Sequence, residues 1–182
     1  MTRTALSYVG IGSNLGDPVM RVRAAIDALA ALGRVRASSL YRSEPLGDPD
    51  QPWYVNAVCE LRTDLAPEAL LVELRGLERR AGRPERRMHW GPRVLDLDLL
   101  LYDQVEVASK TLQVPHPRYH ERRFVLEPLA ELAPELPHPR LGRVVREFLE
   151  ELDDPLRVER ITGTFLDPAS TGMIASGPAP EV

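Results

Sequence analysis

The 182-residue sequence predicts an α+β fold, and three observations support that class. Short apolar stretches are typical of strands, whereas two other segments repeat their apolar residues at helical spacing. Each helical segment opens on a proline and is followed by a glycine, at Pro18 and Gly33 and again at Pro67 and Gly82. The strands and helices also interleave along the chain and do not form separate blocks.

The expected elements follow one order from the N-terminus. Strands are expected at residues 5–11, 35–41 and 54–63 and over the apolar run after residue 95, with helices at 18–32 and 67–81. This β-α-β-β-α-β order is the split unit of ferredoxin-like folds. An extra hairpin after residue 102, with a strand near 105–107, and C-terminal helices at 123–132 and 141–152 complete the expected fold. Residues 1–153 are therefore expected to form a single domain, with 154–182 as a flexible tail.

Composition excludes several classes of protein. The net charge of −4 argues against broad binding to nucleic acid, which requires a basic surface. A single cysteine, Cys59, excludes an internal disulfide, and its apolar strand pattern predicts a buried, inert thiol. The sequence shows neither a secretory leader nor a stretch of membrane-spanning length, so we expect a cytoplasmic protein with no membrane partner. We also expect a monomer.

The most informative segment carries two aspartates inside an apolar run. Asp96 and Asp98 are two residues apart, so in a strand they point to the same face, with Cα atoms roughly 6.5–7 Å apart. The leucines at alternate positions would point the other way, into a core: Leu95, Leu97, Leu99 and Leu101. Two like charges on one face repel each other unless a cation lies between them, and oxygen ligands suit Mg²⁺. On the pair alone, a solvated strand face stays an equally open interpretation.

Arginines crowd the segment before this strand. Seven of the nineteen residues from 75 to 93 are arginine: Arg75, Arg79, Arg80, Arg83, Arg86, Arg87 and Arg93. A guanidinium group binds phosphate oxygens in pairs, and carboxylate-bound cations beside arginines are what polyphosphate transfer requires. The chain has 22 arginines and one lysine, so arginine is its usual basic residue everywhere and not only in this segment. The arginines of the expected loop, from residue 83 onward, are the better candidates.

Side chains, and not a glycine-rich loop, must hold any polyphosphate. The turn from Gly10 to Gly16 lacks the spacing of a dinucleotide-binding loop, and the chain has no P-loop, so a plain strand-to-helix turn is favoured there. His116 lies between two prolines, which fix the backbone on both sides. Its imidazole could donate to a phosphate oxygen or be purely structural. The other candidates for phosphate are Arg83, Arg86, Arg93 and Arg122.

A planar ligand would need aromatic faces and an amide. Tyr54 and Phe124 offer the faces, and Asn56 offers a donor and an acceptor to a heterocycle. Trp90 could stack on a ligand or pin its loop to the core. The proline- and glycine-rich stretch at 43–52 has the length and composition of a binding loop.

Five motifs in one order make the chain resemble the 6-hydroxymethyl-7,8-dihydropterin pyrophosphokinases of folate biosynthesis. The resemblance covers Tyr8 to about Pro139 and rests on residues 10–16 (GIGSNLG), 41–47 (YRSEPLG), 51–57 (QPWYVNA), 90–98 (WGPRVLDLD) and 114–117 (VPHP). The fourth motif is highly specific to that family. The resemblance implies a ferredoxin-like α+β fold, in agreement with the element order.

The resemblance also implies an activity. The family transfers diphosphate from ATP to the hydroxymethyl group of the pterin, giving the pterin diphosphate and AMP. The chain would then be an ATP- and Mg-dependent diphosphotransferase acting on small molecules, with ATP as co-substrate. Asp96 and Asp98 would bind two Mg²⁺ ions, and Arg83 and Arg93 would act with them in catalysis.

By the same resemblance, particular residues face each substrate. The ATP-binding residues would be Glu78, Arg83, Arg86, Trp90, Arg93, His116 and Arg122. The pterin-binding residues would be Ser43, Pro45, Leu46, Gly47, Tyr54, Asn56, Trp90 and Phe124. Two positions depart from the family's pattern, because Glu85 stands where some relatives have a basic residue and Arg75 where a neutral residue can occur.

Two other classes of function are compatible with the element order. An RNA-binding module on the same scaffold would carry exposed aromatics on its strands and a basic face, whereas this sequence places aspartates there. A metal-dependent phosphohydrolase, or a pterin-binding protein without catalysis, would keep part of the same constellation. The presence of Asp96, Asp98, Arg83 and Arg93 together argues against a loss of catalysis.

Overall fold

The computed structural model describes residues 3–82 and 91–162. Predictions that fall on Arg83, Glu85, Arg86 and Trp90, and on the tail from residue 163, lie outside the described residues. The strands are β1 (Ala5–Ser13), β2 (Arg34–Ala37), β3 (Tyr41–Ser43), β4 (Tyr54–Thr63), β5 (Asp96–Tyr102), β6 (Val107–Ala108), β7 (Gln113–Val114) and β8 (Val158–Arg160). The helices are α1 (Pro18–Leu29), α2 (Pro67–Arg80), α3 (Arg123–Leu132) and α4 (Val145–Glu151), with a 3₁₀ turn at Tyr119–Glu121.

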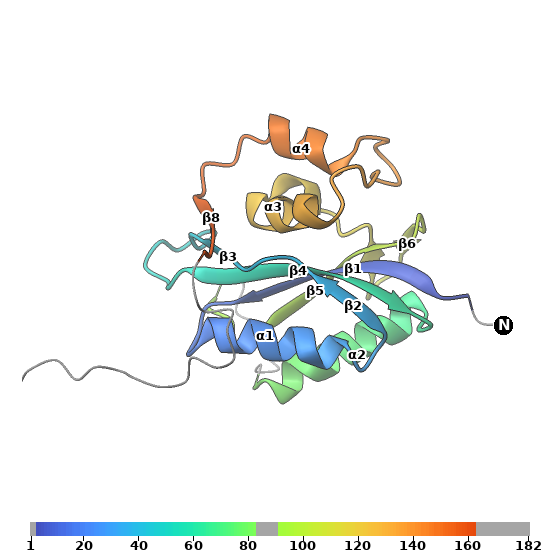
Figure 1. The fold of residues 1–182 in the computed structure, drawn as a ribbon, viewed down its shortest axis with the longest axis horizontal. Coiled ribbons are helices and arrows are strands. Elements are labelled where there is room, and N and C mark those ends of the chain that lie inside the picture. The colour runs from blue at the N-terminus through green and yellow to red at the C-terminus, as the bar shows by residue number, and fades with distance from the viewer. Residues whose placement is uncertain (1–2, 83–90, 163–182) are drawn as a thin grey trace, which may run out of the picture.

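A central antiparallel sheet separates two layers of helices (Figure 1). The strand order is β5-β1-β4-β3-β8, and β2 pairs with β4 beside β3. Helices α1 and α2 cover one face of this sheet, whereas α3 and α4 cover the other (Figure 1). The fold is therefore mixed α/β with an antiparallel sheet, as the interleaved elements predict.

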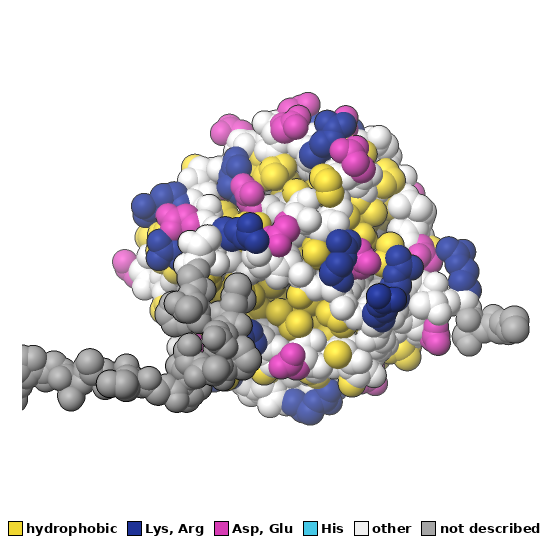
Figure 2. Space-filling view, in the orientation of Figure 1, with side chains coloured by type: hydrophobic (Ala, Val, Ile, Leu, Met, Phe, Trp, Pro, Cys, Tyr) yellow, Lys and Arg dark blue, Asp and Glu magenta, His cyan; other side chains and the backbone are white. Residues whose placement is uncertain are grey.

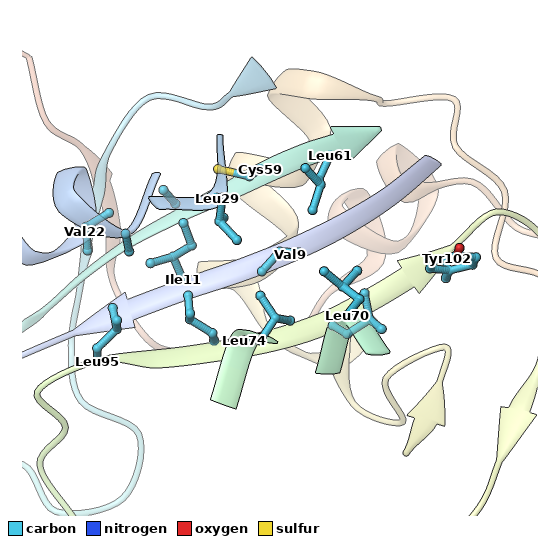
Figure 3. Close-up of a cluster of buried hydrophobic side chains, with 14 of the residues drawn as sticks. Val9, Ile11, Val22, Leu29, Cys59, Leu61, Leu70, Leu74, Leu95 and Tyr102 are labelled. Atoms are coloured by element: carbon cyan, nitrogen blue, oxygen red, sulfur yellow. The ribbon is translucent and has the colours of Figure 1, made fainter. Parts of the chain in front are cut away.

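The first core lies between the sheet and the pair α1 and α2 (Figure 3). Val9 and Ile11 of β1 point into it with Val22 and Leu29 of α1 and Leu74 of α2, all of them buried. Cys59 is in the same core, and burial raises the pKa of its thiol to about 12, which agrees with the predicted inert thiol. Burial of such side chains is the main term that stabilises the layers.

The second core lies on the other face, beneath α3 and α4, and corrects one prediction. Leu95, Leu97 and Leu99 point into the first core as expected, but Leu101 belongs to the second core. The reason is a β-bulge, because Tyr8 pairs with Leu101 and Val9 pairs with Leu99, which leaves Leu100 as an extra residue. The bulge reverses the alternation, so both Leu100 and Leu101 join the second core.

Most element boundaries follow the sequence pattern, and the exceptions have identifiable structural causes. The expected strand at 35–41 is interrupted after Ala37, where Ser39 turns its backbone N–H and hydroxyl to Glu131 of α3. The expected helix at 141–152 begins only at Val145, since Gly142 has a φ of 66°, outside the helical region. The strand expected near 105–107 is β6, which pairs with β7 in a separate two-stranded sheet.

Strand β8 lies beyond the domain boundary expected at residue 153. It pairs with β3, so the sheet continues into residues for which the sequence predicts a flexible tail. None of the described helices has the length and apolar character needed to span a membrane. Acidic and basic side chains are interspersed over the face seen in Figure 2.

Candidate active site

Two cavities meet at the predicted acidic pair. The first lies on the second-core face, between the ends of β1 and β4, the loop after β3 and the start of α3. The second lies between α2, β5 and the segment from Ser109 to Pro117. Arg93, Asp96 and Asp98 line both cavities. A group bound in one cavity would therefore share these three side chains with a group bound in the other.

Glycines opposite the aspartates keep the first cavity open. Asp98 pairs with Gly10 and Asp96 with Gly12 across the β1–β5 ladder. A Cβ atom at Gly12 would lie 3.3 Å from Asn56 Oδ1, in the space that the cavity occupies. The glycines of this motif thus leave room beside the acidic pair, which sequence reasoning missed because it treated the motif as a plain turn.

Burial and like charge disfavour the ionised form of Asp98 in the acidic pair. Burial, followed by repulsion from Asp96, raises the pKa of Asp98 to about 6, although the charges of Arg122 and Arg93 act in the opposite direction. Arg93 Nη1 donates a hydrogen bond of 2.7 Å to Asp96 Oδ1. The two nearby guanidinium groups therefore offset the effects of burial and repulsion on the pKa of Asp98 only in part.

The donor set fits Mg²⁺ bound together with a substrate. Among the described residues, no group of three or more His, Cys, Asp or Glu side chains converges as a protein-only metal site would require. Mg²⁺ usually binds to one or two carboxylates and completes its octahedron with water and phosphate oxygens. Asp96 and Asp98 offer that partial set on one strand face.

Arg93 is held by residues that sequence reasoning did not single out. The backbone of Arg93 makes two hydrogen bonds with Asn14, from its N–H to Asn14 Oδ1 at 2.7 Å and from the Asn14 N–H to its carbonyl at 3.0 Å. The Asn14 side chain is buried and also donates to Gln51 and to the carbonyl of Pro52. Asn14 therefore joins the Arg93 segment to the loop at 44–53, a long-range role that no local pattern reveals.

Arg122 and Glu78 line the two cavities beside the acidic pair, with Arg122 half-buried in the first and Glu78 buried in the second. Burial lowers the pKa of Arg122, and its Nε is buried without a hydrogen-bond partner within the described structure. Glu78 is 4% exposed, and its Oε1 accepts the backbone N–H of Leu97 at 2.8 Å on the open edge of β5. Arg122 thus keeps a donor for a ligand, and Glu78 supports the strand that carries the aspartates.

His116 faces the second cavity as a neutral donor. Its Nδ1 accepts the backbone N–H of Arg118 at 3.2 Å, so the proton of the neutral ring is on Nε2. Burial, with the nearby charge of Arg122, lowers the pKa of His116 to about 4. The imidazole is therefore uncharged at neutral pH and presents one N–H. Arg75 lies along the same cavity and donates to the carbonyl of Thr111 at 3.2 Å.

The first cavity contains most of the predicted pterin-facing residues. Its lining includes Ser43, Leu46, Tyr54, Asn56 and Phe124, whereas Pro45 and Gly47 are not among the residues that line it. Asn56 Nδ2 donates to Ser43 Oγ at 2.9 Å, which fixes the amide and turns its oxygen toward Gly12. Glu44 also lines this cavity and was missed, because an acidic loop residue carries no distinguishing signal in the sequence.

Two cavities that share two carboxylates and an arginine are the arrangement that phosphoryl transfer between two substrates requires. A model of the 7,8-dihydro-6-hydroxymethylpterin-pyrophosphokinase (HPPK) family matches residues 8–134. A 2-amino-4-hydroxy-6-hydroxymethyldihydropteridine pyrophosphokinase of Methylorubrum extorquens is 43% identical over 164 residues, which cover 88% of this chain and 99% of that protein. The Pseudomonas aeruginosa protein of the same name is 47% identical over 145 residues, covering 78% and 88% of the two chains.

Solved structures agree at the level of the fold. A Plasmodium falciparum HPPK-DHPS structure superposes with a TM-score of 0.65 at 13% identity, over 82% of this chain and 45% of that one. The chain belongs to the HPPK family. It is therefore a pyrophosphokinase.

Proposed function

We propose that the two cavities are the two substrate sites of this pyrophosphokinase, which transfers diphosphate from ATP to the hydroxymethyl group of 6-hydroxymethyl-7,8-dihydropterin. The pterin would occupy the first cavity and ATP the second. The observation that carries this proposal is the sharing of Arg93, Asp96 and Asp98 by both cavities. Groups that serve both substrates have to lie where the diphosphate passes between them.

We assign different steps of the proposed reaction to different described side chains. The pterin hydroxyl oxygen forms a bond to the β-phosphorus, and the bond between that phosphorus and the oxygen bridging to the α-phosphate breaks, so AMP leaves. Arg93 and Arg122 would stabilise the negative charge that moves between the cavities. His116, as a neutral N–H donor, would orient a phosphate oxygen of ATP.

Two Mg²⁺ ions are proposed at Asp96 and Asp98. Bound there, Mg²⁺ would neutralise phosphate charge and lower the pKa of the pterin hydroxyl. Support comes from the oxygen donor set and from the pKa of Asp98, which burial and then repulsion from Asp96 raise, since a bound cation would favour the ionised carboxylate. Arg83, Arg86 and Trp90 remain proposed ligand-binding residues outside the described part of the chain.

In the first cavity, Tyr54 and Phe124 would contact the faces of the pterin ring. The Asn56 amide is fixed by Ser43. Together with the loop that begins at Glu44, Asn56 would form hydrogen bonds with the edge of the pterin ring. Glu78 is proposed to act on the ATP side mainly through β5, because its carboxylate already accepts a backbone N–H of that strand.

A finer description of the fold is part of the proposal. The order β5-β1-β4 with β2 on the far side of β4 supports a ferredoxin-like core, to which β3, β8, the β6–β7 hairpin and two C-terminal helices are added. Residues 1–153 are proposed as the pyrophosphokinase domain, to whose sheet β8 adds a further strand. We also propose a cytoplasmic monomer that acts on small molecules and binds neither nucleic acid nor membranes. Size-exclusion chromatography with light scattering tests the monomer.

A nucleotide product assay tests the proposed function. The chain is incubated with ATP and Mg²⁺, with and without 6-hydroxymethyl-7,8-dihydropterin, and the nucleotides are separated. AMP that forms only with pterin is the expected result. Formation of ADP and phosphate without pterin would indicate a phosphohydrolase. A folded sample that binds pterin without turnover would indicate a binding protein.

A further inference from the structure

Strand β8 pairs with β3, the strand that leads into a loop of the first cavity. β8 lies outside residues 8–134, the span that the family model matches, and pairs with β3 so that Val158 faces Ser43. The loop of residues 44–53 begins directly after β3 and ends at the start of β4. Its first residue, Glu44, lines the first cavity, and its last precedes Tyr54, which lines it too.

Arg157, directly before β8, holds the first residue of this loop. The Glu44 N–H donates to the Arg157 carbonyl at 3.1 Å, and the Arg157 N–H donates to Glu44 Oε2 at 3.0 Å. The guanidinium also donates from Nε to Glu44 Oε1 at 2.8 Å. Glu44 is thus fixed through both its backbone and its carboxylate by a single residue.

The same guanidinium lies on the last residue of the loop. Its carbon is 5.1 Å from the centre of the Trp53 ring, within the range of a cation–π contact. Arg42 contacts the same ring at 5.3 Å and donates to Glu159 of β8 at 2.7 Å. Glu44 and Trp53 are nine residues apart in the chain, and Arg157 contacts both.

We propose that Arg157 is a positioning residue for the pterin, because it fixes both ends of the loop 44–53 and so sets the shape of the first cavity before the substrate binds. The inference rests on the proposed function, in which that cavity takes the pterin. Each exposed contact is weak on its own. Their joint effect is to order the loop in advance, which reduces the ordering cost that binding would otherwise carry.

Steady-state kinetics test this role. Arg157→Ala is expected to raise the KM for the pterin roughly five- to tenfold, because one ion pair and one cation–π contact are lost, with the KM for ATP within twofold of wild type. Arg157→Lys keeps the charge near Glu44 but not the planar group over Trp53, so an intermediate KM is expected. Arg160→Ala is the matched control, because Arg160 lies three residues after Arg157, at the end of β8, and donates to Ser39, away from the loop.

Tryptophan fluorescence provides a readout that does not depend on turnover. The chain has two tryptophans, so Trp90→Phe leaves Trp53 as the only one. In that background, Arg157→Ala is expected to increase quenching of Trp53 by acrylamide, whereas Arg160→Ala does not. Since Arg157 is 67% exposed, both variants are expected to fold.

The outcomes separate this inference from the proposed function. A rise in pterin KM for Arg157→Ala alone supports the inference. An active wild type whose pterin KM is unchanged by Arg157→Ala, or raised equally by Arg160→Ala, overturns it. The proposed function fails in a different way, by the absence of pterin-dependent AMP from the wild-type chain.

Discussion

At the scale of single residues, the negative charges of Asp96 and Asp98 repel each other, and a bound cation would compensate them. Asp98 is half-buried beside Asp96, and this burial, followed by the repulsion, raises its pKa to about 6. Two arginines near the pair reduce the imbalance without removing it. A site with residual negative charge next to two cavities is organised to receive a cation together with a phosphate group.

Asp98→Asn is expected to stabilise the metal-free chain at pH 8 by on the order of 2 kcal/mol. A carboxyl whose pKa is higher in the folded state destabilises the fold once it ionises. The penalty is thus complete above pH about 6 and absent near the unfolded value of 3.8. Urea unfolding at pH 8 and pH 4 measures the difference. Asp27→Asn, at an exposed site on α1, is the control, and an equal gain at both pH values would contradict the prediction.

Arg93→Ala is expected to lower kcat by about 10²-fold or more, with a much smaller change in the affinity for ATP. The guanidinium lies between the cavities and would act mainly on the charge of the transition state. Rapid-quench kinetics and calorimetric titration with a non-hydrolysable ATP analogue measure the two quantities. Arg36→Ala, which removes a surface ion pair with Glu60, is the control. A loss of ATP affinity with kcat unchanged would assign Arg93 to ground-state binding.

At the scale of elements, close contacts between backbone segments determine where a turn requires glycine. Gly33 connects α1 to β2, and a Cβ atom there would lie 2.1 Å from the carbonyl oxygen of Arg62. Sequence reasoning identified Gly33 only as the end of a helix. The tight contact with β4 depends on how the elements pack, which the local pattern does not contain.

Gly33→Ala is therefore expected to lower the free energy of unfolding by about 2–4 kcal/mol. Relief of the clash requires movement of backbone, not of a flexible side chain. Thermal and urea denaturation measure the loss. Gly142→Ala is the control, since Gly142 has a positive φ but no atom within 4 Å of the added Cβ, and about 1 kcal/mol is expected there. A similar loss in both variants would mean that φ alone matters.

At the scale of the whole molecule, the two helix layers contribute to different cavities: the start of α3 lines the first cavity, and α2 on the other face of the sheet lines the second. Leu29 of α1 and Leu126 of α3 are both fully buried, one in each core. Phe124 and Arg122, which line the first cavity, lie at the start of α3. The position of α3 on the sheet therefore affects the cavity directly, whereas α1 affects it only through the sheet.

Leu29→Ala and Leu126→Ala are each expected to lower the free energy of unfolding by about 2–5 kcal/mol, the usual cost of a buried leucine. Only Leu126→Ala is expected to raise the KM for the pterin, because it loosens α3 beneath Phe124. Urea unfolding and steady-state kinetics well below the melting temperature distinguish the two effects. An equal rise in KM for both variants would show that the cavity depends on overall stability alone.

Much of this protein was determined by local sequence. Helix starts at Pro18 and Pro67, the full extent of β4 and of α3, and the shared face of Asp96 and Asp98 all follow from periodicity and turn residues. These features depend on residues a few positions apart, where backbone geometry fixes which side chains share a face.

Tertiary structure alone decided the features that depend on residues far apart in the sequence. The bulge that sends Leu101 to the second core requires the pairing of β1 with β5. The hydrogen bonds from Arg93 to Asn14, and from Arg157 to Glu44, join residues that are 79 and 113 positions apart. Such contacts form only when the sheet brings distant segments together, and their energies depend on burial and packing that no window of sequence contains.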